Sequence, residues 1–343
     1  MSDWLSTFPG YRQALTTAKR AFGRFIQTGP TPKHVGIIMD GNRRYAKNHK
    51  IEIKEGHNLG FDSMANVLEI LYESGVKCAS VYAFSIENFR RSSLEVKWLM
   101  DLAKSKFQQI NQHSDLCAEY GIRIKIIGNK KLIPPDVAKI LQQTEEITKD
   151  NKRALLNICF PYTSRDEMTN SIKCAVDQST IDHDFVIDED TLESLFYTHD
   201  APPLDLLVRT SGTFRLSDFL LWQCVSPDCS IVFVDKLWPA FTPFDMAKIL
   251  FNWGFNMYWY GKGNGYSTTQ ISTKNFNLAE YDSNVDLNDA TGSSGFQRFA
   301  SSESEEAEDE DDVVTEESSQ SGGVDELDTV TSEEESDSNK KGR

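Results

Sequence analysis

The chain has 343 residues, of which 39% are hydrophobic, so it is long enough to bury a sizeable apolar core in one large domain or two smaller ones. Residues 301–343 hold 17 acidic and 3 basic side chains and account for 14 of the 16 net negative charges. The rest of the chain is nearly neutral and lacks the excess of basic residues that a nucleic-acid partner requires. We expect no transmembrane helix and no signal peptide, and the six cysteines form no Cys-x-x-Cys pair, which indicates reduced core thiols in a cytosolic compartment.

Residues 1–29 are predicted to form an N-terminal amphipathic segment with a helix over 11–27. Apolar side chains recur there at helical spacing, and four basic residues lie mainly on the other side. A basic amphipathic helix can lie on an anionic membrane surface, and it can equally pack on its own domain. The sequence leaves both interpretations open.

An apolar run over 35–39 is predicted to be a buried strand, and it ends abruptly in the polar sequence Asp40-Gly41-Asn42-Arg43-Arg44. Gly41 permits a tight turn, and residues 43–48 have the composition of a helix that begins there. The start of that helix presents free backbone N–H groups, which suit a phosphate, and the Asp40 carboxylate can hold a divalent cation. The pattern therefore indicates a diphosphate with Mg²⁺, although Asp-Gly-Asn also forms simple turns readily.

The chain up to residue 260 alternates strands with helices. After a helix over 58–74, the second strand covers 77–84 and ends in polar residues 85–91, from which a long helix runs towards residue 119. Further strands are predicted over 122–127, 153–160, 204–208 and 230–234, with helices from 134, from 164 to about 176 and over 242–256. This alternation predicts an α/β domain over 30–260 with a central, mostly parallel six-stranded sheet flanked by helices.

Three of the predicted strands end in clusters of polar side chains. Parallel sheets bind ligands at the carboxyl ends of their strands, and guanidinium groups clamp phosphate oxygens in two-point fashion. Arginines at these ends can therefore supply two diphosphate sites that share one metal. The arginines are Arg43, Arg44, Arg91, Arg209 and Arg215. Each also has a plainer interpretation, such as an ion pair between Arg91 and Glu95.

Residues 261–343 are predicted to be a disordered acidic tail. From about residue 277, Ser, Glu and Asp dominate, and few apolar residues are available to offset the chain entropy. Serines and threonines beside acidic residues are typical of sites for an acid-directed kinase, and a purely solubilising role explains the same composition.

Several ordered blocks of sequence resemble the cis-prenyltransferase family of undecaprenyl and dehydrodolichyl diphosphate synthases, and in particular its eukaryotic, fungal-like dehydrodolichyl branch. The blocks are Met39-Asp-Gly-Asn-Arg-Arg-Tyr-Ala-Lys47, Gly56-His57, Ala83-Phe-Ser-Ile-Glu-Asn-Phe89, Phe160-Pro-Tyr-Thr-Ser-Arg165, Arg209-Thr-Ser-Gly212, Arg215-Leu-Ser217 and Leu237-Trp-Pro239. The resemblance covers roughly residues 30–260. It implies an enzyme that condenses isopentenyl diphosphate (IPP) repeatedly onto farnesyl diphosphate (FPP), with cis double bonds, to make long-chain polyprenyl diphosphate for dolichol synthesis and protein glycosylation.

The resemblance also implies roles for individual residues. Asp40 would hold Mg²⁺ at the diphosphates, and Ser85 and Asn88 match positions near the reacting carbons and the leaving diphosphate, so these three are the candidate catalytic residues. The candidate ligands of FPP are Gly41, Asn42, Arg43, Arg44, His57 and Arg91. The candidate ligands of IPP are Arg209, Arg215 and Ser217.

The sequence departs from the family pattern at three places. A bacterial Glu that helps to hold the metal has Ile231 near its position here, so metal binding would rest on Asp40 and the substrate phosphates. A bacterial Arg before the Gly56-His57 block is replaced by Ile53, beside Lys54. The Arg-x-Gly segment with which the family completes its active site does not occur after Arg215. We therefore expect a homologous non-catalytic subunit to supply it.

A growing prenyl chain needs an apolar tunnel, and the helices over 58–74 and from 92 onward carry apolar side chains that can line one or form ordinary core. These side chains are Val67, Leu68, Leu71, Trp98, Leu99, Leu102 and Phe107. A long apolar product implies release into a membrane surface. We therefore expect peripheral attachment to the cytosolic face of the endoplasmic reticulum membrane, with lipid droplets as a second location.

The main alternative is a non-catalytic binding subunit of a heteromeric prenyltransferase. Such a subunit does not need the complete set of polar residues that this chain carries at its strand ends. No Asp-Asp-x-x-Asp motif occurs in the part predicted to fold, which disfavours a trans-type prenyl synthase. Neither a Gly-rich phosphate loop nor a dinucleotide fingerprint occurs, which disfavours a nucleotide-binding protein.

Overall fold

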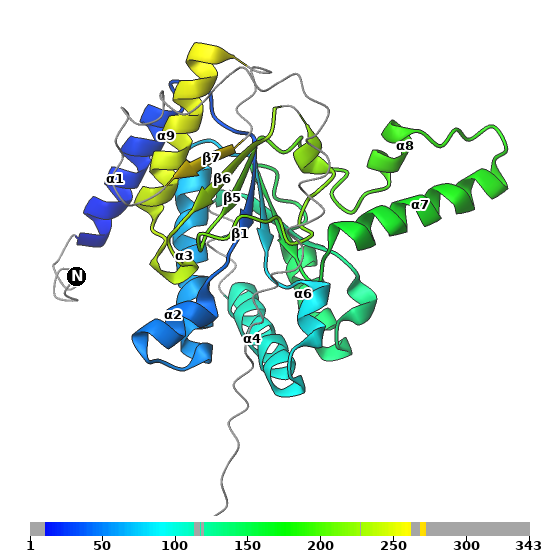
Figure 1. The fold of residues 1–343 in the computed structure, drawn as a ribbon, viewed down its shortest axis with the longest axis horizontal. Coiled ribbons are helices and arrows are strands. Elements are labelled where there is room, and N and C mark those ends of the chain that lie inside the picture. Colours follow the sequence, from blue (N-terminus) through cyan, green and yellow to red (C-terminus); the bar gives the residue numbers. More distant parts are fainter. Residues whose placement is uncertain (1–10, 113–116, 118–119, 227, 262–267, 272–343) are drawn as a thin grey trace, which may run out of the picture. The chain divides into compact units, whose positions relative to one another are not determined.

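A seven-stranded parallel sheet lies at the centre of the structure, a computed structural model in which residues 11–112, 117, 120–226, 228–261 and 268–271 are described (Figure 1). All of these belong to Met1–Asn277, one of the two units into which the chain divides. The strand order is β3-β4-β2-β1-β5-β6-β7, and every neighbouring pair is parallel. The strands are β1 (His34–Ile38), β2 (Cys78–Tyr82), β3 (Ile122–Ile127), β4 (Ala154–Cys159), β5 (Leu206–Arg209), β6 (Ser230–Val234) and β7 (Thr268–Ile271). The six predicted strands are confirmed.

The seventh strand, β7, lies in a stretch for which the sequence predicts disorder. It pairs with β6 in parallel, from Ile231↔Thr268 to Val234↔Ile271, so the disorder expected over 261–343 does not hold for these four positions. The expectation rested on the scarcity of apolar residues. An edge strand, however, gains its backbone hydrogen bonds from the neighbouring strand whatever its apolar content. The prediction for residues 272–343 lies outside the described residues.

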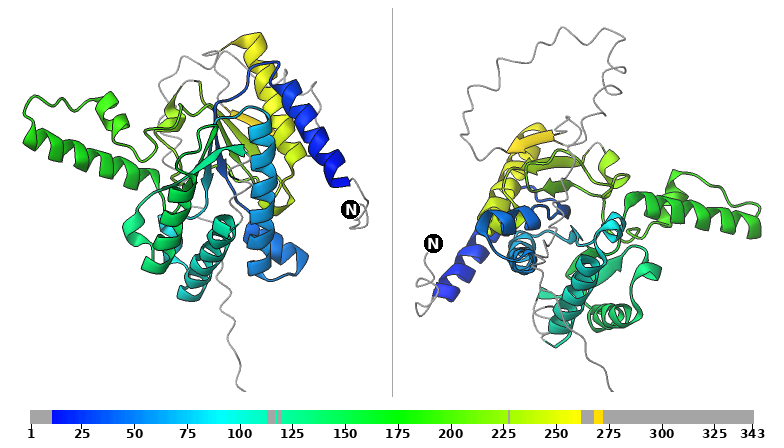
Figure 2. Two further views of the ribbon diagram at one scale, coloured as in Figure 1. Left: turned by 180° about the vertical axis from the view of Figure 1, so that it is seen from behind. Right: turned by 60° about the horizontal axis from the view of Figure 1, so that its bottom comes forward.

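Helices cover the sheet and extend beyond it. They are α1 (Tyr11–Ile26), α2 (Asn42–His49), α3 (Ile53–Glu73), α4 (Ser93–Gln112), α6 (Pro135–Thr148), α7 (Ser164–Ile181), α8 (Glu189–Ser194) and α9 (Pro243–Tyr260). α3 begins before the predicted residue 58, and α7 continues past the predicted end near 176. In Figures 1 and 2, α7 and α8 extend away from the sheet. Within the described ranges, no helix is both long and apolar enough to cross a membrane.

Successive side chains of the central strands enter two separate apolar clusters, one on each face of the sheet. Ile37 and Val208 lie in the larger cluster, whereas their neighbours Ile38 and Leu207 lie in the smaller one. All residues of β1 and β5 are buried, which explains why these strands occur in the sequence as continuous apolar runs without alternation. Gly36 of β1 is required for packing, because a Cβ there would lie 2.7 Å from Leu207 Cδ1.

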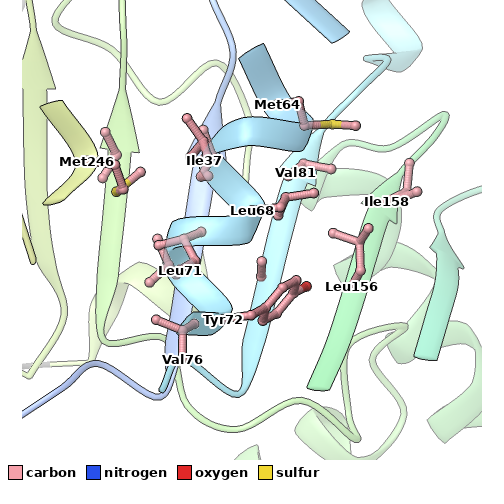
Figure 3. Close-up of a cluster of buried hydrophobic side chains, with 14 of the residues drawn as sticks. Ile37, Met64, Leu68, Leu71, Tyr72, Val76, Val81, Leu156, Ile158 and Met246 are labelled. Atoms are coloured by element: carbon pink, nitrogen blue, oxygen red, sulfur yellow. The ribbon is translucent and has the colours of Figure 1, made fainter. Parts of the chain in front are cut away.

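Figure 3 shows the part of the larger cluster in which α3 packs against β1, β2 and β4; α6 and α9 also contribute buried residues to it. Four of the seven predicted tunnel residues are buried members of this cluster, and Leu99 packs against it. The four buried residues are Val67, Leu68, Leu71 and Phe107. Trp98, Leu99 and Leu102 of α4 are half-buried. The interpretation as ordinary core therefore describes the α3 residues, and the tunnel stays a prediction.

The N-terminal helix packs on its own domain. Ile26 of α1 is buried in the larger cluster, and Lys19 forms an ion pair with Glu69 of α3. Gly23 allows the two helices to approach closely, because a Cβ at this position would lie 2.3 Å from the Glu73 carbonyl oxygen. Of the two interpretations that the sequence left open, packing on the domain is thus observed.

Candidate active site

The carboxyl ends of β2, β1 and β5 lie side by side in the sheet. The register pairs Ile37 of β1 with Val81 of β2, and Ile38 of β1 with Arg209 of β5. The segments that follow these three strands therefore meet at one edge, as the polar strand ends predicted. This edge carries the candidate site.

Gly41 sets the direction in which the chain leaves β1. Its φ is +112°, in the left-handed region, and a Cβ would lie 2.9 Å from Leu237 Cδ2. Gly41 is also the residue before α2, where no side chain caps the helix, so the first N–H groups of α2 are available to an anion. Only glycine fits this turn, which places Asp40 on one side and the start of α2 on the other.

Asp40 is the centre of the polar cluster. Its Oδ2 accepts hydrogen bonds from Arg209 Nη2 at 2.8 Å, from Ser211 Oγ at 2.7 Å and from Arg44 Nη2 at 3.4 Å. Thr210 Oγ1 holds the Asp40 backbone, since it accepts from the Asp40 N–H at 3.1 Å and donates to the Asp40 carbonyl at 2.8 Å. These contacts join the ends of β1 and β5.

Asp40 is ionised at neutral pH. Burial raises the pKa of Asp40, but hydrogen bonds from Ser211 and Arg209 and the charges of Arg209 and Arg44 outweigh burial, so the pKa lies below its ordinary value. The Asp40 side chain is 32% exposed, whereas that of its partner Arg209 is 3% exposed. A buried cation is thus paired with a carboxylate that still reaches solvent.

Arg209 is enclosed by the loop that follows it. Its Nη1 donates to Ser217 Oγ at 2.7 Å and to the Arg215 carbonyl. The loop folds back through left-handed backbone at Ser211, Gly212, Ser217, Asp218 and Leu220. Ser217 therefore joins the cluster directly, whereas Arg215 contributes its carbonyl and leaves its side chain exposed. Arg44 of α2 ties down the same loop through a bond from Nη1 to the Ser211 carbonyl at 3.2 Å.

Ser85 and Asn88 hold each other at the end of β2. Ser85 begins the 3-10 helix Ile86–Arg90, and the Ser85 N–H donates to Asn88 Oδ1 at 3.0 Å. Ser85 Oγ in turn accepts from the Glu87 N–H at 3.2 Å. Tyr82 O–H donates to the Ser217 carbonyl at 3.2 Å, which connects this strand end to the loop around Arg209. The two residues thus belong to the same edge as Asp40, and no hydrogen bond among the described residues joins them to it.

His57 and Arg91 form a second group. Arg91 Nη1 lies 2.9 Å from Glu95 Oε1, which is the ion pair considered above as the plainer interpretation. Burial has the largest effect on the pKa of His57 and lowers it, together with the charges of Arg91 and Arg43, to about 4. The negative charge of Glu95 acts in the opposite direction. His57 is therefore neutral at pH 7. Its buried Nε2 has no hydrogen-bond partner within the described chain.

The side chain of Asn42, a predicted substrate ligand, is turned towards helix α3. Its Nδ2 donates to the Met39 carbonyl at 3.3 Å, and its buried Oδ1 finds no partner among the described residues. A Cβ at Gly60 of α3 would lie 2.2 Å from that oxygen, so the side chain is turned into the α2–α3 contact. The backbone N–H of Asn42, in the first turn of α2, can serve a phosphate, and the role of the Asn42 side chain stays a prediction.

Residues that the sequence analysis did not single out complete the cluster. Ser211 and Thr210 bond Asp40 directly, and the backbone N–H of Trp238 donates to the Asp40 carbonyl at 3.0 Å. The signal was available, because Ser and Thr directly follow Arg209 at the end of a strand. Only the register between β1 and β5, however, shows that these hydroxyls meet Asp40.

The residues present fit one Mg²⁺ ion shared with substrate. All three donors to the Asp40 carboxylate reach Oδ2, and no hydrogen bond from the described residues reaches Oδ1. The described residues contain no group of three or more His, Cys, Asp or Glu side chains able to hold a metal. Mg²⁺ commonly binds through one or two carboxylates together with substrate phosphates, so a single free carboxylate oxygen suits it.

A parallel sheet covered on both faces, with arginines, a helix start and one ionised carboxylate at its carboxyl edge, defines an α/β enzyme that binds phosphorylated substrates. The sequence pattern of the prenyltransferase family described as putative undecaprenyl diphosphate synthase matches residues 38–261. This chain therefore belongs to that family, the cis-prenyltransferases.

Relatives with known names agree with this membership. A dehydrodolichyl diphosphate synthase complex subunit of Schizosaccharomyces pombe is 43% identical over 246 residues, which cover 71% of this chain and 92% of that protein. A human dehydrodolichyl diphosphate synthase complex subunit is 40% identical over 245 residues, which cover 71% of this chain and 73% of the human protein. The resemblance found from the sequence blocks is confirmed.

Solved structures show the same fold. The crystal structure of lavandulyl diphosphate synthase from Lavandula x intermedia, in complex with dimethylallyl diphosphate, has a TM-score of 0.61 at 28% identity and covers 65% of this chain and 95% of that chain. A probable undecaprenyl diphosphate synthase from Campylobacter jejuni has a TM-score of 0.54 at 25% identity with the same coverage. The predicted fold class is confirmed, apart from the apolar tunnel, which stays a prediction.

Proposed function

We propose that the chain is the catalytic subunit of a dehydrodolichyl diphosphate synthase, which condenses IPP repeatedly onto FPP and makes long-chain polyprenyl diphosphate for dolichol synthesis and protein glycosylation. The ion pair between Asp40 and the buried Arg209, at 2.8 Å, carries this proposal, because it joins two strand ends in one anion-binding cluster. The named relatives support the subunit assignment.

Two groups of donors on either side of Asp40 support two diphosphate sites. On one side, the start of α2, Arg43, Arg91 and neutral His57 would bind the FPP diphosphate. On the other side, Arg209, Arg215 and Ser217 would bind IPP, and the protein partners of both Nη groups hold the Arg209 guanidinium in place. Arg44 lies between the groups and bonds both Asp40 and the loop.

Asp40 would hold Mg²⁺ through Oδ1, with the remaining ligands from diphosphate oxygens. When bound, the ion stabilises the negative charge that builds on the leaving diphosphate. The protein keeps the Asp40 carboxylate ionised through Arg209 and Ser211 and fixes its direction through Thr210.

The reaction follows from this arrangement. The allylic C–O bond of FPP breaks, its electron pair leaves with the diphosphate, and the arginines stabilise the charge on the leaving oxygens. The double bond of IPP then attacks the allylic carbon, and the proton lost from IPP passes to a diphosphate oxygen as the new cis double bond forms. Ser85 and Asn88 would position the reacting carbons, because their mutual hydrogen bond fixes them before substrate arrives.

The growing chain would run between α3 and α4. The His57 ring lies 5.5 Å from the Trp98 ring, so the proposed FPP site adjoins the half-buried apolar residues of α4. Leu102→Trp should then shorten the products seen by chromatography without a change in the rate of the first condensation. Products of wild-type length would contradict this path.

A homologous second subunit would supply the missing Arg-x-Gly segment. We also propose peripheral attachment to the endoplasmic reticulum membrane and lipid droplets, because the product is a long apolar lipid. The names of the relatives, which are subunits of complexes, support the second subunit, and the apolar nature of the product supports the membrane attachment.

Labelled IPP, FPP and Mg²⁺, supplied with and without the second subunit, test the proposal. Asp40→Ala and Arg215→Ala should abolish or strongly reduce product formation by the complex. Asp136→Ala is the matched control, because this exposed carboxylate pairs with Lys104 away from the cluster. Full activity of Asp40→Ala would refute the catalytic role, and full activity of the chain alone would refute the need for the second subunit.

A further inference from the structure

Helix α9 exposes aromatic rings along one side. Phe251, Phe255, Tyr258 and Trp259 occupy positions i, i+4, i+7 and i+8, which lie on one face of an α-helix. Tyr258 is 72% exposed and Trp259 is 65% exposed. A single exposed aromatic side chain is common on protein surfaces. Four exposed aromatic side chains on one helix face form an apolar patch, and such patches mark sites of interaction.

The rings touch one another and extend onto α1. Centroids are 6.4 Å apart for Phe251 and Phe255, 6.0 Å for Phe255 and Trp259, and 5.6 Å for Tyr258 and Trp259. Phe25 of α1 stacks on Phe251 at 6.2 Å. Figures 1 and 2 show α1 and α9 side by side. We call these five residues the aromatic face.

A small apolar hollow opens within the aromatic face. It has a volume of about 160 Å³, and Ile26, Gly29, Pro30, Leu250 and Gly254 lie around it together with several of the rings. Gly254 allows α9 to approach Pro30 closely beside the hollow, because a Cβ at this position would lie 2.6 Å from the Pro30 carbonyl oxygen. A cavity of about 150 Å³ holds one benzene molecule, so the hollow can take a short stretch of hydrocarbon chain.

The segments that carry the aromatic face contain basic but no acidic side chains. Residues 24–30 and 246–259 contain no Asp or Glu. Lys248 lies on the same helix face as the rings, and Arg24 precedes Phe25; both are exposed. The carboxylates of Glu69 and Glu73 on the neighbouring α3 pair with Lys19 and Arg20 of α1.

The aromatic face extends away from the candidate active site. α9 begins beyond the carboxyl end of β6, where Lys236 pairs with Asp245 of its first turn. Its last turns lie at the opposite edge of the sheet, because Trp253 and Met257 share a pocket with Lys33 and Asp205, which precede β1 and β5. Changes to Phe255, Tyr258 and Trp259 are therefore separable from changes to the site.

We propose that the aromatic face docks this protein on a lipid bilayer that contains anionic lipids. Aromatic rings flanked by Lys and Arg suit the boundary between headgroups and acyl chains, and the lack of Asp and Glu in residues 24–30 and 246–259 allows anionic headgroups to approach. The hollow takes one acyl chain from the bilayer. This inference deepens the proposed membrane attachment, and it rests on that part of the proposed function but not on the condensation reaction.

Flotation with vesicles tests the docking. The full chain is mixed with vesicles of phosphatidylcholine alone or of phosphatidylcholine with phosphatidylinositol, and the bound fraction is measured. We expect stronger binding to the anionic vesicles and a loss of about tenfold or more in the variant Phe255→Ser/Tyr258→Ser/Trp259→Ser. The matched control is Ile181→Ser/Val186→Ser/Ile187→Ser, which removes three exposed apolar side chains elsewhere and should bind as the wild type does.

A second measurement does not depend on removal of the rings. Trp259→Phe keeps the aromatic face, and brominated phosphatidylcholine quenches only tryptophans that enter the bilayer. Quenching in the wild-type chain that disappears in Trp259→Phe supports the docking. Equal quenching in both chains, or unchanged flotation of the triple variant, overturns it.

A protein partner on this face is the remaining outcome. If the triple variant loses the second subunit in size-exclusion chromatography while it still floats with vesicles, the face is a subunit interface and the proposal is wrong. Failure of the condensation reaction is a separate result: a wild-type complex that makes no polyprenyl diphosphate, yet floats through the aromatic face, refutes the proposed catalysis alone.

Discussion

The pair formed by Asp40 and Arg209 yields a quantitative prediction. A simple turn would tolerate Asp40→Ala without loss of stability, but the structure places Arg209, 3% exposed, against Asp40 at 2.8 Å. At an effective dielectric constant of about 20, unit charges about 4 Å apart attract by about 4 kcal/mol. The 32% exposure of Asp40 weakens this attraction by solvent screening, so we expect a coupling of about 2 kcal/mol.

A double-mutant cycle measures the coupling. Asp40→Ala, Arg209→Met and the double variant are unfolded in urea, and their free energies of unfolding are compared with the wild type. Each single variant leaves one charge without its partner, so the double variant should be less destabilised than the sum of the single variants by about 2 kcal/mol. A coupling below about 0.5 kcal/mol, as in an exposed surface pair, would refute the reasoning.

The same cycle has a pH dependence with a definite sign. The pKa of Asp40 is lower in the folded state than in the unfolded state, so its contribution to stability is complete above the ordinary carboxyl pKa. It is lost as pH falls through the lower, folded value. The coupling should therefore be constant at neutral pH and decline only in strong acid.

Three further predictions concern single positions. Gly41→Ala should lower the free energy of unfolding by about 1–3 kcal/mol and reduce kcat/KM, because the φ of Gly41 is +112° and Leu237 fills the space that a Cβ would need. A stable, fully active variant would contradict the turn described here. The NMR signals of His57 should titrate near its pKa of about 4. Because this pKa is lowered in the folded state, the contribution of His57 to stability is full above its ordinary pKa and is lost as pH falls towards 4. A titration midpoint near neutrality would show that His57 is not buried among cations. Gly23→Ala should push α1 away from Glu73 and increase proteolytic cleavage near α1. Gly29→Ala is the control for packing, because a Cβ there would meet only the Ile26 carbonyl oxygen, at 3.9 Å; equal cleavage in both variants would contradict the close contact of α1 and α3.

Much of the fold could be predicted from the sequence because parallel strands buried on both faces leave a strong local signal. β1 and β5 are continuous apolar runs, and polar residues mark where they end. β7 carries no such signal, since its place in the sheet depends on backbone pairing with β6. The early start of α3 was missed for a related reason: the polar residues of its first turn face outward and interrupt the apolar pattern.

The candidate site was predictable in its residue types but not in its contacts. Asp40, Arg209 and Ser217 were selected, and the structure brings them together. The inward turn of Asn42 was not predictable, because it depends on Gly60 in another helix. Local sequence names the groups at each strand end, whereas the register between distant strands decides which of them touch.

The loop that wraps Arg209 also determines how the site meets a ligand. A free arginine loses about 2 kcal/mol of rotamer entropy when a ligand immobilises it. In this protein Asp40, Ser217 and the Arg215 carbonyl already fix the guanidinium. An arriving diphosphate thus meets an anchored cation, and the ordering cost at Arg209 is met during folding, before any substrate binds.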